Sequence, residues 1–328
     1  MKKKHFWSKS GIDGFLILLV GVVLLAYLRP EIGAANGAFP LAALANYGIS
    51  LIFFFYGLRL SGKKLRAGLD NRKLHILVHC ATFILFPLSV WLLRPLFGNE
   101  TSLWLGVFYL AALPSTVSSS VVMVSIAKGN IPAAIFNASV SSLAGVFITP
   151  LWMSAALSGA SGADFSQLLS IIPKLILQVL LPVMAGMALN RKWGSFAERH
   201  GRLLRLFEQS MILLIVYTSF CTSFAERLFE AFSLFRLAAC TAGMIGLFGA
   251  VYGMITFACR RMHLNREDTI TAQFCGSKKS LVHGIAMSKV IFSGYGGIGI
   301  VLLPIMLYHA LQLMIVSAIA HRKAKEKE

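Results

Sequence analysis

Two adjacent lysines, Lys278 and Lys279, lie near the middle of a long apolar segment, residues 268–290. That length matches the roughly 20 residues of a membrane-spanning helix. Charged side chains at bilayer depth are costly unless other groups bind them. Gly276 and Ser277 directly precede the lysines, and a Gly-Ser pair is a common place for a helix to break. We therefore expect this segment to unwind near its centre and to line a polar site.

The composition places the whole chain in a membrane. Of the 328 residues, 57% are hydrophobic and 13% charged, whereas a soluble domain has about 25% charged residues. The sequence predicts an all-α membrane protein with ten transmembrane helices, separated by connecting loops that include 60–73 and 190–206. The ten apolar segments are 11–28, 40–59, 74–93, 103–127, 131–156, 167–189, 207–224, 235–259, 268–290 and 297–320.

The net charge of +18 follows the membrane topology. Of the 31 lysines and arginines, 23 lie on the side of the N-terminus, five on the opposite side and three within apolar segments. Because cytoplasmic loops are enriched in lysine and arginine, this bias predicts a multi-pass protein of the cell (inner) membrane with both termini in the cytoplasm. It also explains the high charge without a nucleic-acid partner.

A second break is predicted in the fourth apolar segment. Pro114 removes a backbone donor there, and hydroxyl side chains follow it that can satisfy the freed groups. Pro114 and Gly276 are 162 residues apart, close to half of the chain. With five helices in each half, the second half (161–328) is inserted upside down relative to the first (1–160). Broken helices at matching positions of two inverted halves indicate a transporter's binding site at mid-membrane.

Three short motifs carry a family resemblance: Leu113–Ser119, Lys128–Asn130 and Gly276–Ser280. With them the chain resembles the bile acid:sodium symporter superfamily over essentially its whole length. Within that superfamily it is similar to the SBF-like branch, which includes the seventh member of solute carrier family ten. The Gly-Ser-Lys-Lys-Ser motif is the specific part of the resemblance, since ten helices alone would not distinguish the family.

The resemblance implies a 5+5 inverted repeat made of two structural units. Helices 1, 2, 6 and 7 would form a panel domain. Helices 3–5 and 8–10 would form a core domain, in which helices 4 and 9 cross at their unwound centres. It further implies a secondary active transporter that moves an organic anion, of the bile-acid, sterol-conjugate or carboxylate type, usually together with sodium.

The sequence departs from the family where the resemblance would place the sodium ligands. Phe274 stands where the symporters carry a glutamate, and Lys278 and Lys279 stand where they carry glutamine and asparagine. The hydroxyl ligands of the fifth helix correspond to Ala134 and Ala138. Sodium needs several hard oxygen ligands, so these replacements argue against sodium coupling.

We expect the lysines to replace the sodium ions. At a crossover of broken helices, the first half-helices end in free carbonyls with partial negative charge, and the second halves begin with free N–H groups. One ammonium group, of Lys278 or Lys279, would lie against the carbonyl ends as a tethered cation. The other would face the cavity and pair with the anionic substrate. Burial disfavours the charged form of an amine, which opens a route to proton coupling.

The predicted substrate- or ion-binding residues are polar groups near the two breaks. For most of them, the alternative interpretation is that the side chain only forms a hydrogen bond between packed helices. Every Asp and Glu falls near the end of a predicted helix, which argues against a cation antiporter. The predicted set is Pro114, Ser115, Thr116, Ser118, Ser119, Asn137, Ser141, Gln273, Gly276, Ser277, Lys278, Lys279, Ser280, His283, Tyr308, His309 and Gln312.

Two functions of different classes are consistent with this sequence. The first is secondary active transport by alternating access. The alternative is a membrane-embedded sensor or regulator that kept the fold and lost transport. An enzyme is not expected, because the sequence offers no nucleophile–base pair, no paired carboxylates and no cluster of metal ligands. The expected partners are a small organic anion and the lipid bilayer, with no cofactor; the oligomeric state is not predicted.

Overall fold

The computed structural model describes residues 14–33, 41–59, 71–98, 100–161, 173–174, 176–227, 233–293 and 297–325, and all the regular structure in these ranges is helical. The helices are α2 (Gly14–Leu28), α3 (Pro30–Gly33), α4 (Leu41–Leu58), α6 (Arg72–Cys80), η1 (Ala81–Leu85), α7 (Phe86–Leu92), η2 (Arg94–Phe97), α8 (Thr101–Ala112), α9 (Ser118–Ile126), α10 (Ile131–Ser161), η3 (Ile176–Leu180), α12 (Leu181–Arg199), α13 (Gly201–Ala225), α14 (Leu234–Arg261), α15 (Arg266–Ser277), α16 (Leu281–Ile291) and α17 (Ile298–Lys325).

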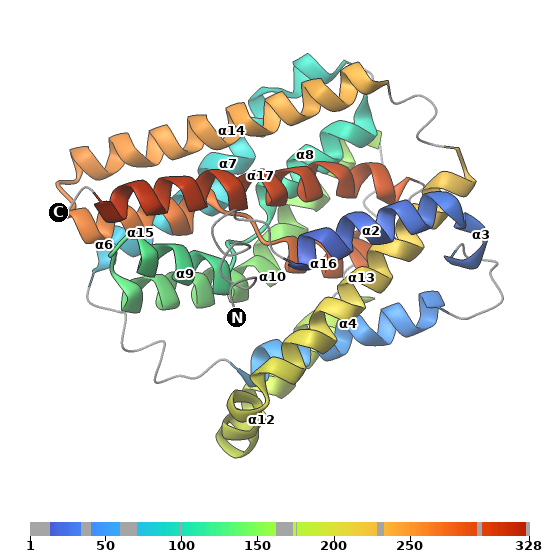
Figure 1. Cartoon of the computed structure of the whole chain (residues 1–328), viewed down its shortest axis with the longest axis horizontal. Helices are drawn as coiled ribbons and strands as arrows, with labels where there is room; N and C mark the ends of the chain where they lie inside the picture. Colours follow the sequence, from blue (N-terminus) through green and yellow to red (C-terminus); the bar gives the residue numbers. More distant parts are fainter. Residues whose placement is uncertain are drawn as a thin grey trace, which may run out of the picture.

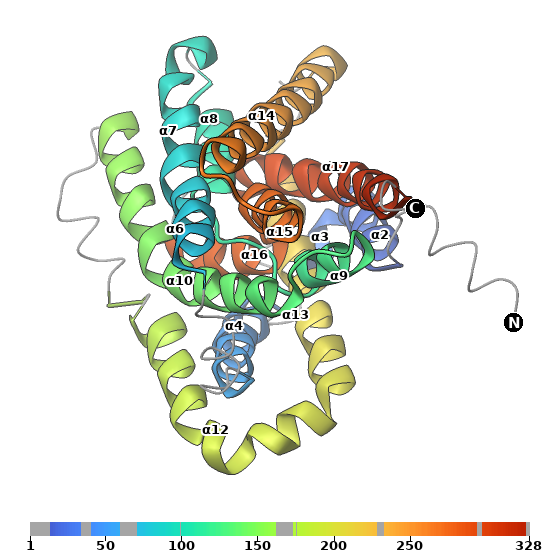
Figure 2. The same ribbon diagram turned by 90° about the vertical axis from the view of Figure 1, so that its left-hand side faces the viewer.

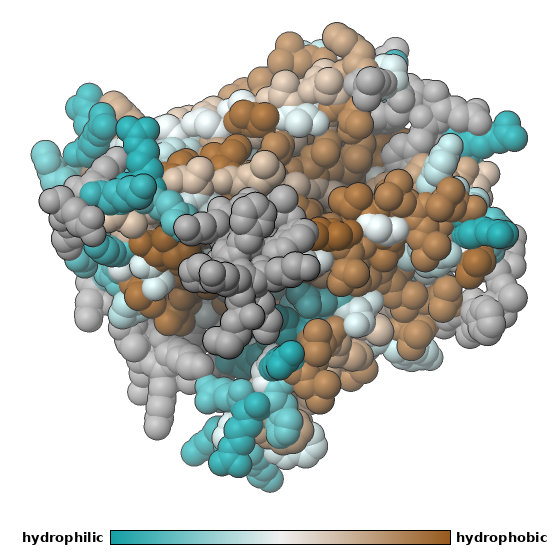
Figure 3. Space-filling view, viewed as in Figure 1, coloured by the Kyte–Doolittle hydropathy of each residue, from teal (hydrophilic) through white to brown (hydrophobic). Residues whose placement is uncertain are grey.

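Helices occupy most of the described part of every apolar segment that the sequence marks. Five of them are long and apolar enough to cross a membrane: 72–92, 131–157, 201–225, 235–261 and 298–325. Shorter apolar helices cover 14–28, 47–58 and 101–112. Hydrophobic residues cover much of the face shown in Figure 3. Leu24, Leu92 and Phe257 are among the large hydrophobic residues that are exposed. The chain is therefore an all-helical, multi-pass membrane protein, and the exact number of ten spans stays a prediction.

Two sets of helices pack mainly within themselves (Figures 1 and 2). In one, α13 lies against α2, and both α12 and α13 lie against α4. In the other, α8 packs on α17 and α10, and α15 packs on α14 and α6. The two sets meet where α13 contacts α16 and α17 and where α16 contacts α4. The predicted inverted repeat, with its boundary at residue 160, and the panel and core domains remain predictions.

One predicted loop is wrong. Residues 190–206 are helical except at His200, because α12 runs on to Arg199 and α13 starts at Gly201. The segment contains four arginines and three leucines, which have high helix propensity, and a hydropathy boundary does not detect a helix that leaves the apolar zone. Most of the other predicted loop, residues 60–70, lies outside the described ranges, as do the basic residues before position 14 and the start of the sixth apolar segment.

Glycines set the distance between α4 and α12. A Cβ atom on Gly57 would lie 2.2 Å from the carbonyl oxygen of Val183, and one on Gly186 would lie 2.1 Å from that of Phe54. Small residues of this kind allow the backbones of membrane helices to approach closely.

The substitution Gly186→Ala should therefore destabilise the protein, by about 1–3 kcal/mol as overpacking usually does. The measurement is the thermal unfolding midpoint in detergent. Gly249→Ala on α14 is the matched control, because a Cβ there meets no atom within 4 Å; it should be neutral or slightly stabilising, since alanine favours helix. Equal effects of the two substitutions would contradict this account.

Candidate functional site at the crossing of two broken helices

Both predicted helix breaks are present, and they meet. The first lies between α8 and α9 at Leu113–Val117, and the second lies between α15 and α16 at Lys278–Ser280. The backbone N–H of Ser280 donates to the carbonyl oxygen of Pro114 at 2.9 Å. This bond joins the two unwound segments across 166 residues of sequence. The second break starts slightly later than predicted, because α15 continues through Gly276 and Ser277 before the backbone becomes extended at Lys278.

The ammonium group of Lys279 binds the carbonyl end of α8. Its Nζ lies 2.6 Å from the carbonyl oxygen of Ala111, 2.8 Å from that of Leu113 and 2.7 Å from that of Thr82. Three acceptors match the three N–H donors of an ammonium group. The same Nζ lies 4.2 Å from the centre of the Phe86 ring, within the range of a cation–π contact. The side chain is 1% exposed.

The third carbonyl comes from a wide helical turn that sequence reasoning missed. Thr82 belongs to η1, where the N–H of Phe86 bonds five residues back to Ala81. Pro87 follows and has no N–H to donate. The carbonyls of Thr82 and Phe83 instead accept hydrogen bonds from the side chains of Lys279 and Trp152. In the sequence, Pro87 inside an apolar segment could have indicated this wide turn.

Helix α17 supports the second break. The Tyr308 hydroxyl donates to the carbonyl of Ser277 at 2.7 Å. The Gln312 side chain accepts from the N–H of Lys279 and donates to its carbonyl, both at 2.9 Å. Backbone groups freed by unwinding must find partners inside a membrane, and these two predicted residues supply them. Ser280 then starts α16 by accepting the N–H of His283.

Helix α10 supports the first break in the same way. The N–H of Ser115 donates to the hydroxyl of Ser141 at 2.9 Å, and the Thr149 hydroxyl donates to the carbonyl of Ala112 at 2.8 Å. The Ser115 hydroxyl is buried without a hydrogen-bond partner among the described residues. Ser141 was predicted, whereas Thr149 was missed because a single threonine in an apolar helix carries no distinctive signal.

Lys278 points to the start of α9. Its Nζ donates to the Ser119 hydroxyl at 2.7 Å, and Ser119 in turn donates to Thr116 at 3.0 Å. Its side chain is fully buried. In the described part of the chain, no carboxylate forms an ion pair with Lys278 or with Lys279. The two neighbouring amines therefore have different surroundings: one binds a cluster of carbonyls, and the other a single hydroxyl.

A cavity of about 270 Å³ adjoins the crossing, between the α4–α13 side and the α9–α16–α17 side. Its wall includes five of the predicted residues, namely Thr116, Ser119, Ser280, His283 and His309. Lys278 is not in the wall; its ammonium group lies one hydrogen bond behind Ser119. The apolar part of the wall is formed by Phe15, Val117, Leu281, Val282 and Leu313.

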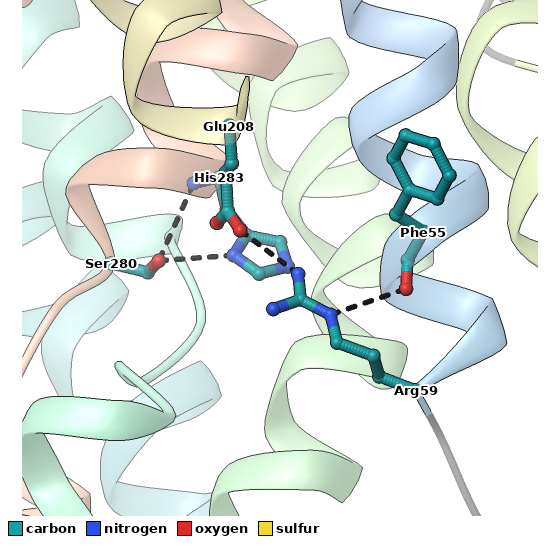
Figure 4. Close-up of polar contacts among 5 residues, drawn as sticks. All are labelled: Phe55, Arg59, Glu208, Ser280 and His283. Atoms are coloured by element: carbon teal, nitrogen blue, oxygen red, sulfur yellow. Dashed lines mark hydrogen bonds and ion pairs between the residues drawn. The ribbon is translucent and has the colours of Figure 1, made fainter. Parts of the chain in front are cut away.

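Charged wall residues from the α4–α13 side were missed by the sequence analysis. Arg59, just after α4, binds Glu208 of α13 with Nη2 2.9 Å from Oε2. Arg205, Gln209 and Tyr56 line the same cavity. Figure 4 shows the Arg59–Glu208 pair together with His283 and Ser280. Arginine and glutamate at the edges of apolar segments are indistinguishable, in sequence alone, from ordinary topology signals.

The other predicted residues lie away from the cavity. Asn137 joins α10 to α6 through His75, with 3.1 Å between Oδ1 and Nδ1, and Gln273 joins α15 to α14 by donating to Thr256 at 2.8 Å. Gly276 lets α15 approach Ile255, which a Cβ would meet at 2.9 Å. Ser118 is the first residue of α9, and its side chain lies outside the described set.

One carboxylate is more deeply buried than its position near a helix end suggested. Asp268, in the first turn of α15, is 4% exposed. It accepts amide hydrogens from Asn71 at 2.6 Å, from Asn130 at 2.8 Å and from Asn265 at 3.0 Å. These bonds hold the start of α6 and the turn between α9 and α10 against α15. They therefore help to fix the position of α9, part of the first broken helix, relative to α15, part of the second.

Sodium ligands are scarce around the crossing. Phe274, Ala134 and Ala138 are fully buried and provide no side-chain oxygen. Among the residues that the structure describes, no group of three His, Cys, Asp or Glu side chains could hold a metal ion. The carbonyls that would suit a cation here are those that bind Lys279.

Two interrupted helices that cross inside a bundle, beside a cavity between two sets of helices, define the class of membrane transporters with discontinuous helices. Residues 13–325 match the SBF-like CPA transporter family, and the chain belongs to this family. It is 39% identical to "Uncharacterized protein PA2026" of Pseudomonas aeruginosa, over 96% of this chain and 94% of the relative. It is 36% identical to "Putative symporter YfeH" of Escherichia coli, over 97% and 94%. It is 30% identical to "Sodium/bile acid cotransporter 7-B" of Xenopus laevis, over 94% and 90%. The predicted SBF-like membership is confirmed.

Proposed function

We propose that the chain is a secondary active transporter of an organic anion that works by alternating access and needs no sodium ion at the helix crossing. The cavity beside the crossing carries this proposal. It lies between two sets of helices, where their relative movement would change its access. Its wall combines apolar side chains with arginines, which suits an anion with an apolar body.

The electrostatics of the cavity favour an anion. The half-helices α9 and α16 begin at its wall, and helix N-termini carry partial positive charge. Among the described residues, the charged side chains in the wall are two arginines and one glutamate. Lys278 adds a buried positive charge directly behind Ser119. A carboxylate or a sterol conjugate would balance this charge, in keeping with the bile acid in the names of several relatives.

The absence of a sodium requirement follows from Lys279. In discontinuous membrane helices, carbonyl ends coordinate the coupling cation. Here the carbonyls of Ala111 and Leu113 at the end of α8, and that of Thr82 in η1, are bound by a covalently attached ammonium group, which does not dissociate during a transport cycle. We propose that this tether stabilises the crossing permanently, so that the driving ion, if any, binds elsewhere or is a proton.

The test is uptake of taurocholate, and of small aromatic carboxylates, into proteoliposomes with sodium chloride or choline chloride outside. Equal uptake in the two salts supports the proposal. Strict dependence on sodium would contradict the role given to Lys279. Binding in a thermal-stability screen without uptake or counterflow would favour the sensor or regulator instead. The proposed setting is the cell inner membrane, with both termini in the cytoplasm.

A further inference from the structure

We propose that Arg59 binds the acidic group of the substrate, that Glu208 is an internal carboxylate competing with it, and that His283 is the second donor. This inference rests on the proposed function, because it assigns the anion-binding groups of the same cavity. It concerns residues that come from both sides of the cavity: Arg59 and Glu208 lie on the α4–α13 side, and His283 lies on α16.

Among the described residues, the bond between Arg59 and Glu208 uses only part of what each group offers. Nη2 of Arg59 lies 2.9 Å from Oε2 of Glu208, and Nε donates to the carbonyl of Phe55, in the last turn of α4, at 3.3 Å. A guanidinium group binds a carboxylate best through two parallel hydrogen bonds. A substrate carboxylate that makes both bonds can therefore replace the single contact of Glu208.

The partial solvent exposure of the pair lowers the free-energy cost of this exchange. The side chains of Arg59 and Glu208 are 30% and 19% exposed, so water reaches both. Solvent access screens the attraction within an ion pair, so this partly exposed pair is weaker than a fully buried one. Arg59 stays paired throughout the exchange, and the displaced Glu208 carboxylate moves toward water. A fully buried pair would not allow this, because breaking it leaves a charge without a partner.

His283 contributes a donor that the protein itself does not use. The residue is 5% exposed, and its Nε2 is buried without a hydrogen-bond partner among the described residues. Its Nδ1 lies 3.0 Å from the Ser280 hydroxyl. That hydroxyl oxygen accepts the backbone N–H of His283. In the tautomer assigned by this proposal, the hydroxyl hydrogen is donated to Nδ1 and the proton of the neutral imidazole is on Nε2, where a ligand would accept it.

The imidazole is held in place by aromatic neighbours. The rings of Phe53 and Tyr56 pack edge-on against it, with centroid distances of 5.9 Å and 5.1 Å. Both belong to α4, the helix that ends just before Arg59. Figure 4 shows the imidazole and the Arg59–Glu208 pair in one view, and all three side chains line the same cavity. A fixed donor beside an exchangeable guanidinium suits a carboxylate or a sulfonate, whose apolar body would lie against Leu281, Val282 and Leu313.

The experiment measures binding of benzoate and taurocholate to the full-length protein in detergent, by ligand-dependent thermal stabilisation. Benzamide, the neutral counterpart of benzoate, shows the contribution of charge. Glu208→Gln removes the competing carboxylate and should tighten binding of the anions about threefold or more, because the substrate then displaces no charged group from Arg59. Arg59→Gln and His283→Leu should each weaken it about tenfold or more, because hydrogen bonds to charged groups are the strong ones.

Two further variants separate the proposed roles from general damage. Arg59→Lys keeps the charge but loses the paired donors, so it should weaken binding less than Arg59→Gln. Glu100→Gln breaks another glutamate–arginine contact, the one to Arg236 at 2.8 Å, and should leave anion binding unchanged. The melting temperature of each variant without anion shows whether it is folded.

The proposal is overturned if neither anion stabilises the natural protein, if Glu208→Gln weakens binding or leaves it unchanged, or if Arg59→Gln binds normally. These outcomes differ from a failure of transport. The predicted binding pattern without uptake into proteoliposomes would keep the site and reject transport. Uptake by the natural protein with unaltered affinities in the variants would keep transport and reject this site.

Discussion

Replacing Lys279 by methionine is expected to lower the free energy of unfolding by about 3 kcal/mol or more. The physical reason is the three carbonyls of Ala111, Leu113 and Thr82, which have the Lys279 ammonium group as their shared donor. A buried acceptor that loses its donor costs about 1–3 kcal/mol, and methionine fills the space of the lysine without donating. The measurement is equilibrium or thermal unfolding in detergent, with Lys192→Met at an exposed position of α12 as the control.

The alanine variant of the same residue should behave differently toward salt. Lys279→Ala leaves space beside the three carbonyls, and a hard cation can use carbonyl oxygens as ligands. We therefore expect sodium chloride, compared with choline chloride at equal concentration, to raise the melting temperature of Lys279→Ala but not that of the natural protein or of Lys279→Met. A Lys279→Met variant as stable as the natural protein would show that the ammonium group does not hold the crossing together.

The helix breaks could be predicted because each has a local cause. Pro114 lacks a backbone donor, and two lysines in an apolar segment need an interior site; both facts are visible in the sequence. The role of Gln312 and Tyr308 could be predicted only as a position near the crossing. Which backbone group each one binds depends on how α17 lies beside the break, and pattern alone does not give that arrangement.

The cavity wall was only half predictable. Thr116, Ser119, Ser280 and His283 lie close to the breaks in sequence, and the predicted inverted symmetry placed His309 of α17 beside the crossing, so these residues were found. Arg59 and Glu208 are 149 residues apart and meet only through the packing of α13 on α4. Thr82 was missed for a related reason, since its carbonyl becomes important only because η1 widens beside the crossing. Long-range packing, rather than residue type, separates what the sequence predicts from what it does not.

The second large effect is expected for Lys278→Met, which should keep or raise stability while removing transport. Among the described residues, Lys278 has one hydrogen bond, to Ser119, and its side chain is fully buried. It lies beside the N-terminus of α9, whose partial charge is also positive. A buried charge without an opposite partner is unfavourable, and replacing buried charges by apolar groups of similar volume is often neutral or stabilising. The neighbouring lysines should therefore respond to methionine with opposite signs.

Transport should respond strongly because an anionic substrate supplies the missing negative charge. Because Ser119 separates the Lys278 ammonium group from the cavity, its effect is smaller than that of a direct ion pair, and uptake at low substrate concentration should fall about tenfold or more in Lys278→Met. Ser119→Ala is the matched variant: it removes the hydrogen bond of Lys278 but keeps its charge, and should retain most of the uptake. The measurement is initial uptake of the best-binding anion into proteoliposomes, alongside the melting temperature. If Lys278→Met transports normally, or if Ser119→Ala loses as much activity, the buried charge is not what attracts the substrate.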